Sequence, residues 1–594
     1  MSCYRHSKFW DPMVIKKKGT SVLAGLLSLL NVVALLAISW SCFRGIDLSD
    51  ESYYYLGYLY FNNDPGLYPA SFHQVFGRLF SSYGFTLTDL RFLRLLLTIV
   101  AMVPLYFGVE KILRLKNRAD KVVLFNVMLG GMLMSYVWGP LTLSYNSMSS
   151  ILIAIISGLW LLAAVSDLPY SRVVYSLLLG FLFTILFFVK ITNVLLLPIL
   201  LITTFYFLYQ KKSPGKHLLK PALICITVFC IGSITALAVI GGGVSFIPGA
   251  LEQHVQESFA MSNNPTHSFW FLIKRYYDNA EMVVKRLKYP FITLVVFFTV
   301  LLFLIRGKWG KKSFPGTLFN SIAGLILIIT VVQHRYWTGG SGFHYQVLIP
   351  YLFIGVLVLM NRYLEKRNID FVPLLCLLCI PVAGAVGTNN GLSLQVLIYG
   401  VFIFLTLYYL VYTSQNFWYK QLVFFVMVLL GTTQITTATI FHPYRQARLT
   451  EAVHRLEGVD VLDGLQVDSR VLRLREELAF LDKVDANYVF TYSLQRGMTL
   501  LANKKPFSLE WYHENEVQKM CSVINKSKIE PSDLIFLIPD EAPLEKEVVR
   551  CLEEQGIFLN KQYFIAKTFK FFDRRWKKEM TLHVYQPATA QTRR

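Results

Sequence analysis

Charged residues are scarce in this chain of 594 residues. Asp, Glu, Lys and Arg together make up 16% of the sequence, hydrophobic residues make up 54%, and the mean hydropathy is +0.46. A soluble protein of this size has no need for so much apolar surface. The apolar residues gather in uncharged runs of roughly 17–22 residues, which is the length of helix that crosses a bilayer. The composition therefore predicts a polytopic α-helical membrane protein.

Acidic residues are fewer still. The chain has 37 Asp and Glu against 58 Lys and Arg, which gives a formal net charge of +21. An excess of positive charge is also a feature of proteins that bind nucleic acid. Here, however, the basic residues lie largely in short loops between apolar runs, where they orient a membrane protein. We therefore expect no nucleic-acid partner.

The sequence also lacks metal-ligand motifs, clear internal repeats and low-complexity tracts. Its 8 cysteines include no CxxC pair at zinc-site spacing from a second pair or from histidines. Cys376 and Cys379 stand in an apolar run, where packing is the simpler interpretation. Cys521 and Cys551 lie near the C-terminus and could form a disulfide if the fold brings them together. No metal site is predicted.

Thirteen apolar runs are expected to cross the membrane. The first is Ser21–Cys42, and the others begin near Arg91, Lys121, Met148, Val173, Asn193, Pro221, Phe291, Thr317, Val347, Phe371, Leu394 and Leu422. The N-terminal segment and alternate loops are basic, so the positive-inside rule predicts a cytoplasmic N-terminus. An odd number of spans then puts the C-terminal region outside the cytoplasm. We expect a bacterial inner (plasma) membrane, with that region in the periplasm.

The sequence changes character near Phe441, beyond which charge is denser and apolar runs shrink to strand length. Strands are expected at Asn487–Tyr492, Leu534–Ile538 and Met580–Tyr585, and helices at Glu451–Glu457, Arg470–Val484 and Pro543–Gln555. Strands that alternate with helices predict an α/β domain. We therefore divide the chain into a membrane domain, residues 1–440, and a soluble extracytoplasmic α/β domain, residues 441–594.

Polar residues concentrate in the loops expected on the outer face. The first of these loops, residues 43–90, contains the stretch GIDLSDESYYYLGY, in which Asp47, Asp50 and Glu51 stand among tyrosines. A carboxylate at a bilayer surface loses solvation unless a cation or a proton compensates it. These acids therefore suggest a chemical role. The alternative interpretation is a solvated loop with interfacial tyrosines.

Our candidates for contacting the substrates come from three outer loops. The first loop supplies two of them, the short loop GPLTLSYN supplies two more, and the loop of residues 241–289 supplies the last two. They are Asp47, Tyr54, Tyr145, Asn146, His267 and Arg275.

A few basic residues fall where they could bind an anion. Lys190 interrupts the apolar stretch LLLGFLFTILFFVKITNVLLLP. A lysine there pairs with an anion, faces a water-filled cavity or extends to the membrane surface. Its expected place on the outer face favours the anion. Arg91 and Arg94 open the second span at this level, and His334 and Arg335 end the ninth span there.

Acids beside cations on one outer face suit transfer of a group from a lipid-linked phosphate to a hydroxyl or an amine. An acid removes the proton of the nucleophile, and cations stabilise the charge on the departing phosphate. On this hypothesis the catalytic candidates are Asp50 and Glu51. The phosphate-binding candidates are Lys190, Arg94, His334 and Arg335.

Two short motifs and their order carry a resemblance to a known family. The run Asp50–Tyr54 (DESYY) follows the first span, and Gly180 precedes Phe188–Lys190 (FVK) across an aliphatic stretch. Together with thirteen spans and an outer C-terminal domain, this order resembles the GT-C membrane glycosyltransferases. It resembles most the branch of protein O-mannosyltransferases and lipid A aminoarabinose transferases, which have an Asp-Glu pair at this place. The resemblance implies a GT-C-like fold for the membrane domain.

The resemblance also implies an inverting transfer of a sugar from a polyprenyl-phosphate donor to an envelope glycan, lipid or protein. In that family the Asp of the pair is assigned as the base and the lysine contacts the donor phosphate, so Asp50 and Lys190 take these roles here. The family often has a further acid near a divalent metal in the next outer loop. The loop GPLTLSYN has none. The missing acid argues against a divalent metal, and Lys, Arg or His would supply the positive charge.

Two other functions compete with a glycosyltransferase. A transporter or flippase for a lipid-linked saccharide would commonly show internal repeats and broken helices, and neither is clear in this sequence. A polysaccharide polymerase or ligase of another membrane fold would rely on arginines and histidines of the outer loops. An Asp-Glu pair directly after the first span favours the glycosyltransferase.

Overall fold

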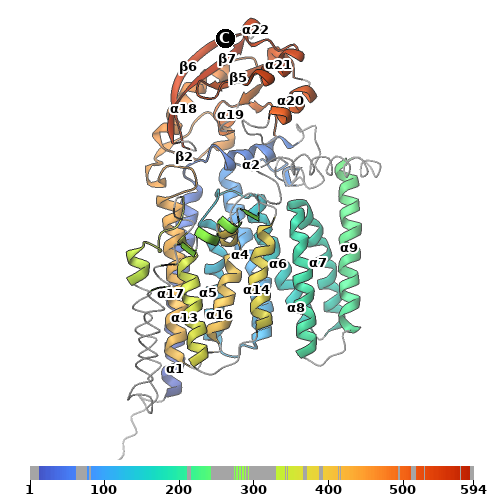
Figure 1. Ribbon diagram of the computed structural model, residues 1–594, viewed down its shortest axis with the longest axis vertical. Helices are drawn as coiled ribbons and strands as arrows, with labels where there is room; N and C mark the ends of the chain where they lie inside the picture. The colour runs from blue at the N-terminus through green and yellow to red at the C-terminus, as the bar shows by residue number, and fades with distance from the viewer. Residues whose placement is uncertain are drawn as a thin grey trace, which may run out of the picture.

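The computed structural model is a bundle of long helices with an α/β region at one end (Figure 1). It describes residues 12–61, 76–78, 80, 82–166, 168–210, 216–241, short pieces between 273 and 292, and residues 329–341, 343, 346–364, 371–386, 392–412, 414, 416–491, 496–509, 517–527, 529–574 and 577–588.

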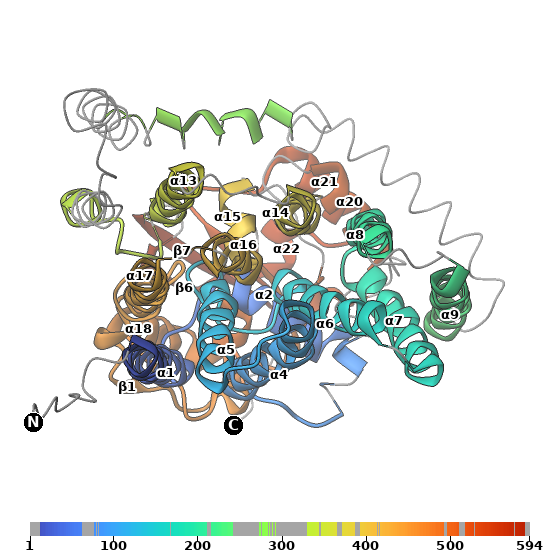
Figure 2. The ribbon, with the colours of Figure 1, turned by 90° about the horizontal axis from the view of Figure 1, so that it is seen from below.

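The helices of the bundle run side by side (Figure 1, Figure 2). Among the described residues, six helices are long and apolar enough to cross a membrane. They are α1 (Pro12–Cys42), α4 (Leu87–Leu113), α6 (Tyr145–Val165), α7 (Pro169–Val189), α9 (Lys216–Gly241) and α17 (Phe417–Thr436) with its continuation η6 (Thr437–Phe441). The bundle also contains the shorter helices α5 (Arg118–Leu133), α8 (Leu196–Gln210), α13 (Ile349–Leu364), α14 (Phe371–Ala385) and α16 (Gly400–Tyr412). This is the architecture of a helical membrane protein. The spans expected from Phe291 and Thr317 lie outside the described residues, so the count of thirteen stays a prediction.

Glycines bring neighbouring helices of the bundle into backbone contact. A Cβ on Gly158 of α6 would lie 2.3 Å from the backbone nitrogen of Leu105 in α4, and one on Gly108 would lie 2.9 Å from the carbonyl oxygen of Gly158. Small residues allow such close approach between apolar helices, where packing rather than water drives association. The pair α4–α6 thereby holds the loops at its upper end in fixed positions.

Helix α2 (Asp50–Leu59) lies between the bundle and the α/β region (Figure 1). Three of its four tyrosines are buried rather than spread at a membrane surface, and Tyr55 and Tyr58 among them are 0% and 1% exposed. The Tyr55 hydroxyl lies 3.0 Å from the carbonyl oxygens of Phe85 and Val461, and the Tyr58 hydroxyl donates to that of Leu143 at 2.8 Å. The interpretation of a solvated loop with interfacial tyrosines is therefore wrong, because these rings fasten α2 to both parts of the molecule.

The C-terminal region contains a five-stranded sheet in the order β4-β3-β5-β7-β6. The strands are β3 (Tyr488–Thr491), β4 (Lys505–Pro506), β5 (Leu534–Pro539), β6 (Tyr563–Asp573) and β7 (Lys578–Pro587). The first three in sheet order are parallel, and β7 pairs antiparallel with both β5 and β6. The helices of this region are α18 (Ser469–Leu478), α19 (Gly497–Leu501), α20 (Val517–Lys526), α21 (Lys546–Glu554) and α22 (Leu559–Gln562). Strands alternating with helices make this an α/β arrangement, as the sequence predicts.

The local predictions for this region hold with one exception. All three expected strands are present, and the expected helices 470–484 and 543–555 correspond to α18 with η9 (Ala479–Lys483) and to α21. The helix expected at Glu451–Glu457 is wrong. A 3₁₀ turn ends at Glu451, and β1 (His454–Arg455) then pairs with β2 (Gln466–Val467). Gly458 follows at φ 72°, a left-handed conformation that turns the chain instead of continuing a helix.

One face of the sheet packs toward α18 and α19, and the other packs on α20 and α21. Neighbouring residues of a strand point to opposite faces, so Val489 and Ile535 join the hydrophobic cluster that continues from the bundle core. Phe490 and Phe536 join a second cluster with residues of α20 and α21, two helices that the Cys521–Cys551 disulfide links. The α/β region is thus docked on the bundle through a continuous apolar core.

Candidate active site

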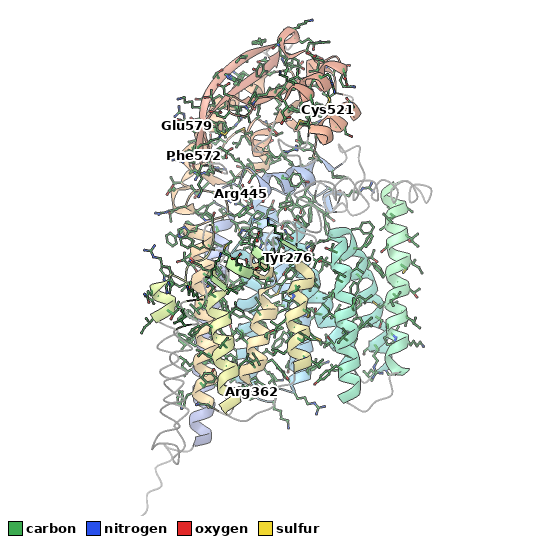
Figure 3. The ribbon with its side chains drawn as sticks, viewed as in Figure 1. Tyr276, Arg362, Arg445, Cys521, Phe572 and Glu579 are labelled. Carbon is green, nitrogen blue, oxygen red and sulfur yellow. A yellow bond between two sulfur atoms is a disulfide. The ribbon has the colours of Figure 1, made fainter. Side chains whose placement is uncertain are left out.

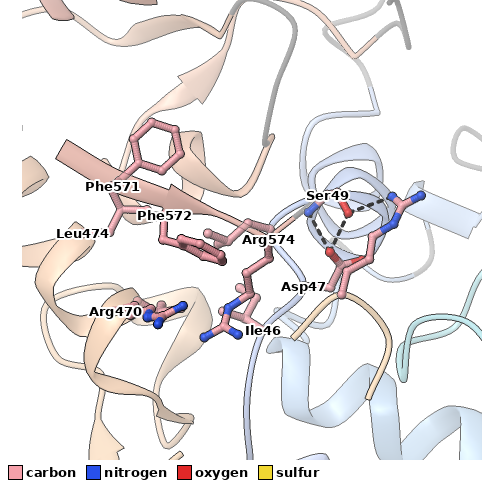
Figure 4. A pocket seen from close by; sticks show the side chains of 11 residues that line it. Ile46, Asp47, Ser49, Arg470, Leu474, Phe571, Phe572 and Arg574 are labelled. Carbon is pink, nitrogen blue, oxygen red and sulfur yellow. Dashed lines mark hydrogen bonds between the residues drawn. The ribbon is translucent and has the colours of Figure 1, made fainter. Parts of the chain in front are cut away.

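Asp47 supports the start of α2. Its Oδ1 accepts hydrogen bonds from the backbone N–H and the hydroxyl of Ser49 at 2.9 and 2.5 Å (Figure 4). Its Oδ2 accepts hydrogen bonds from the backbone N–H groups of Asp50 and Glu51 at 3.1 and 3.2 Å. These N–H groups are the donors that a helix N-terminus leaves without partners. Burial, and then the neighbouring charge of Asp50, raise the pKa of Asp47 to about 7. Asp47 is therefore engaged in holding the helix.

Glu51 is buried in a closed ion pair with Arg91 of α4. Both side chains are 0% exposed, and the two hydrogen bonds from Arg91 to the carboxylate measure 2.9 and 2.6 Å. Arg91 also donates to the carbonyl oxygens of Cys42, Arg44 and Gly45 at 2.8–3.1 Å. These contacts occupy all five N–H donors of the guanidinium. The pair joins α2, α4 and the end of α1.

Asp50 faces away from that pair, as adjacent residues on a helix do. Its Oδ1 accepts a hydrogen bond from Arg445 at 2.8 Å, and its Oδ2 accepts one from the Tyr444 hydroxyl at 2.6 Å. The Asp50 side chain is 22% exposed, whereas that of Glu51 is 0% exposed. Arg445 lies at the boundary between the bundle and the α/β region (Figure 3). Asp50 is thus held by groups that follow the last helix of the bundle.

A cavity of about 380 Å³, part of it open to solvent, lies beside Asp50. We call it the bundle cavity. Its walls include Asp50, Tyr54, Arg94, Trp138, Asn146 and Tyr444. The structure therefore brings together four of the residues singled out in the sequence, together with two aromatic residues that were not.

Arg94 adds a positive charge to the wall of the bundle cavity. Its guanidinium lies 4.0 Å from the centre of the Tyr136 ring. It donates to the carbonyl oxygen of Ser135 at 2.7 Å and also to that of Pro140. Among the described residues its Nε has no hydrogen-bond partner. Arg94 is therefore only partly satisfied by the fold, in contrast to Arg91.

The start of α6 forms another wall. Ser144 caps this helix through a reciprocal hydrogen-bonded box with Ser147, which fixes the first turn of α6 and, with it, Asn146 at the cavity. The Tyr145 ring packs edge-on against Tyr54 with 5.9 Å between ring centres. The Asn146 side chain lines the cavity, and its buried Oδ1 has no hydrogen-bond partner in the part of the chain that the structure describes. Such an oxygen can accept a hydrogen bond from a bound hydroxyl.

The remaining cationic candidates are not on these walls. Lys190 follows α7, and its Nζ donates to the carbonyl oxygen of Gly384 at 2.6 Å. The Tyr399 hydroxyl donates to the same oxygen at 3.0 Å. His334 stacks on Tyr336 with 5.4 Å between ring centres, next to the exposed Arg335. The substrate candidates His267 and Arg275 lie outside the described residues.

Sequence reasoning missed Tyr444, Arg445 and Trp138. Tyr444 and Arg445 belong to the stretch HPYR directly after the last apolar run, so a polar, aromatic boundary was visible. No local pattern, however, connects them with Asp50, which is 394 residues from Tyr444. Trp138 packs edge-on against the Tyr444 ring with 5.6 Å between ring centres. Only the fold reveals this support.

A divalent metal finds no evident ligand set here. Within the described residues, no three His, Cys, Asp or Glu side chains come close enough together to hold a metal ion. Asp47 and Glu51 already spend their oxygens on α2 and Arg91. We therefore derive no step through a metal.

The site thus combines a part-exposed carboxylate, a cationic wall and a buried acceptor around one cavity at the end of a helical bundle.

Comparison of the chain with models of known protein families gives no match, and no curated protein is significantly similar to it.

Proposed function

We propose that this protein is an inverting glycosyltransferase that uses a polyprenyl-phosphate sugar as donor and an envelope glycan, lipid or protein as acceptor. The observation that carries the proposal is the environment of Asp50. Among Asp47, Asp50 and Glu51, Asp50 is the one that lines the bundle cavity, and Tyr444 and Arg445 hold its carboxylate. A general base must be accessible to its substrate and fixed in orientation, and the partial exposure and two hydrogen bonds of the Asp50 carboxylate support that role.

The other two acids are poorly suited to that role. Asp47 spends both oxygens on the N-terminus of α2. Glu51 is closed off by Arg91 and also accepts hydrogen bonds from the backbone N–H groups of Asp47 and Thr142 at 3.2 and 3.1 Å. Neither acid can turn to a substrate without leaving buried donors unpaired. We therefore assign them to positioning Asp50.

In the proposed reaction, Asp50 accepts the proton of an acceptor hydroxyl. The hydroxyl oxygen attacks the anomeric carbon of the donor sugar from the face opposite the phosphate. The bond between that carbon and the phosphate oxygen breaks, and its electron pair leaves with the polyprenyl phosphate. The configuration at the anomeric carbon is therefore inverted.

Two residues of the bundle cavity support this chemistry. Arg94 lines the same cavity as Asp50, and its positive charge can stabilise the negative charge that develops on the leaving phosphate. The unpaired Oδ1 of Asn146 can accept a hydrogen bond from a sugar hydroxyl. Lys190 donates to the carbonyl oxygen of Gly384 and does not line the bundle cavity. We therefore assign the phosphate contact to Arg94 before Lys190.

We further propose thirteen spans in a bacterial inner membrane, with the N-terminus in the cytoplasm and the α/β region in the periplasm. The bundle cavity is lined by residues of α2, and α2 lies at the end of the bundle that carries the α/β region (Figure 1). This arrangement suits a reaction on the outer face. Reporter fusions after Lys420 and after Arg445 should report opposite sides of the membrane. If both report the cytoplasm, this orientation is wrong.

The test of the proposed function is the Asp50→Asn variant, purified and assayed with radiolabelled polyprenyl-phosphate sugars and a membrane acceptor fraction. Asparagine keeps the shape but cannot accept the proton, so transfer should fall by about 10²–10⁴-fold while donor binding is retained. Asp463→Asn is a matched control, because Asp463 also pairs with an arginine, Arg455, but on the exposed surface. It should transfer as the wild type does.

Transfer by Asp50→Asn at a rate near that of the wild type would show that Asp50 is not the base. A transporter or flippase makes a different prediction. Reconstituted in vesicles, the wild-type protein would move a lipid-linked saccharide across the bilayer without forming any glycosidic bond. That result would replace the glycosyltransferase proposal.

A further inference from the structure

A second cavity lies between the first outer loop and the α/β region, with about 470 Å³ of empty space, part of which is open to solvent. We call it the domain cavity. Figure 4 shows its lining: the loop of residues 46–49 on one side, and the start of α18 and the end of β6 on the other. Arg445 lines this cavity and also binds Asp50, which lines the bundle cavity. The two cavities therefore meet at this ion pair.

Three arginines, Arg445, Arg470 and Arg574, line the domain cavity. Arg574 uses one nitrogen on Asp468 at 2.9 Å and remains 23% exposed. Arg470 stacks over the Phe572 ring at 4.4 Å and has no acidic partner among the described residues. Arg445 pairs with Asp50 and Arg574 with Asp468, so Arg470 carries the positive charge in this lining that an anionic ligand would offset.

The acid in the lining does not supply that anion. Asp47 is 1% exposed, and both of its oxygens are turned toward the N–H groups at the start of α2. Its negative charge is therefore directed into the fold. Arg470 and the remaining donors of Arg574 are left to bind a ligand.

The rest of the lining is apolar. Phe571, Phe572 and Leu474 form a wall beside the guanidinium groups. A ligand that fits both surfaces carries an anionic group next to an apolar or ring-shaped part. Guanidinium forks match the oxygens of a phosphate in pairs, which makes phosphate the anion that this set of donors suits best.

We propose that the domain cavity binds a phosphate monoester group on the acceptor, which makes the acceptor a phosphorylated glycan or lipid. This inference rests on the proposed glycosyltransferase function. The donor phosphate would bind in the bundle cavity beside Arg94, and the acceptor phosphate in the domain cavity beside Arg470. Arg445 would then couple acceptor binding to Asp50, because it contacts that carboxylate directly.

The test uses the full chain in phosphatidylcholine nanodiscs, with phenyl phosphate as the soluble probe. The wild-type protein should bind the probe saturably. Arg470→Gln should weaken binding about tenfold or more, because a hydrogen bond to a charged group is lost. Arg473→Gln is the matched control: Arg473 lies one turn further along α18, is exposed and does not line the cavity. Its affinity should equal that of the wild type.

A second arm distinguishes the source of the phosphate. If the ligand is a lipid headgroup, nanodiscs that contain phosphatidic acid should compete with phenyl phosphate in the wild type. If it is a phosphate on a soluble glycan, glucose 1-phosphate should compete and phosphatidic acid should not. Either competition supports a phosphate site. Equal affinity of the wild type and Arg470→Gln, or equal weakening by Arg473→Gln, would overturn the site.

The same variants separate this inference from the proposed function. Arg470→Gln should raise the KM for the acceptor while kcat and donor binding stay near the wild-type values, and Asp50→Asn should retain phenyl phosphate binding. If Arg470→Gln loses the probe but the wild type transfers no sugar, the phosphate site stands and the glycosyltransferase proposal fails. If Asp50→Asn abolishes transfer but Arg470→Gln binds the probe normally, the phosphate site fails alone.

Discussion

Two acid–arginine pairs lie side by side at the start of α2, and they differ in what surrounds them. The pair of Glu51 and Arg91 is closed, with both side chains 0% exposed. The pair of Asp50 and Arg445 is open, with side chains 22% and 30% exposed and a cavity on either side. Adjacent residues of one motif thus occupy a structural site and a candidate chemical site.

The contrast follows from how each arginine is satisfied. Arg91 spends all its donors on Glu51 and on three carbonyl oxygens, so the pair has no capacity for a ligand. Arg445 donates to Asp50 and to the Ser49 hydroxyl at 2.9 Å, and its guanidinium lies 4.8 Å from the Tyr444 ring centre. An acid–arginine motif therefore indicates function only when its donors are not all used by the fold.

The largest effect is expected from breaking the closed pair. Arg91→Met leaves the Glu51 carboxylate buried without its cation, which costs about 3–5 kcal/mol of the free energy of unfolding. Arg445→Met in the part-exposed pair should cost roughly 1 kcal/mol or less. Thermal unfolding of the variants in detergent measures both. Equal losses in the two variants would remove the distinction between closed and open pairs.

The pH dependence of stability tests the hydrogen bonds by which Asp47 caps the N-terminus of α2. Because the pKa of Asp47 rises from its ordinary 3.8 to about 7, the folded protein holds this proton more tightly than the unfolded chain does. The resulting stability is fully present below pH 3.8 and is lost as pH rises to about 7. The midpoint of thermal unfolding should fall on the order of 5 °C across this window.

Asp47→Asn should flatten that dependence, because asparagine does not titrate. Asp463→Asn, on the exposed surface, should keep the wild-type slope. If the unfolding midpoint of Asp47→Asn falls with rising pH as steeply as that of the wild type, another group is responsible for the titration.

The open pair should respond in activity more than in stability. Arg445→Gln removes the cation that orients Asp50, so transfer should fall about tenfold or more. Arg448→Gln is the control, since Arg448 lies three residues further on and is exposed. The measurement is kcat with the polyprenyl-phosphate sugar at saturation. Unchanged kcat in Arg445→Gln would mean that Asp50 needs no partner.

The smallest effect is expected from Tyr444→Phe. This change removes one hydrogen bond to Asp50 and keeps the ring that packs against Trp138. Loss of one such hydrogen bond is worth about 1 kcal/mol of transition-state stabilisation, which corresponds to a decrease in the rate of transfer of about fivefold. The kcat of Tyr444→Phe in the same assay checks this value. A larger loss than in Arg445→Gln would make Tyr444, rather than Arg445, the main support of Asp50.

Much of the local structure could be predicted from the sequence. Within the part of the chain that the structure describes, the uncharged runs correspond to helices of the bundle, and the strands β3, β5 and β7 lie where short apolar runs predict them. Strand β6 was missed, although Phe569 and Phe571 alternate with exposed neighbours in the period of a strand. The opposite directions of Asp50 and Glu51 also follow from the sequence, since adjacent helical residues diverge. All of these features depend on residues close together in the chain.

The partners of the acids were decided by the tertiary structure alone. Asp50 meets Tyr444 across 394 residues, and Glu51 meets Arg91 across 40. Lys190 has the carbonyl oxygen of Gly384 as its partner, at a separation of 194 residues. Periodicity and hydropathy record which face of an element is buried, whereas a hydrogen bond between distant elements depends on how those elements pack. The residue types were therefore visible in the sequence, but which carboxylate is closed and which is open was settled only where α2 lies between the bundle and the α/β region.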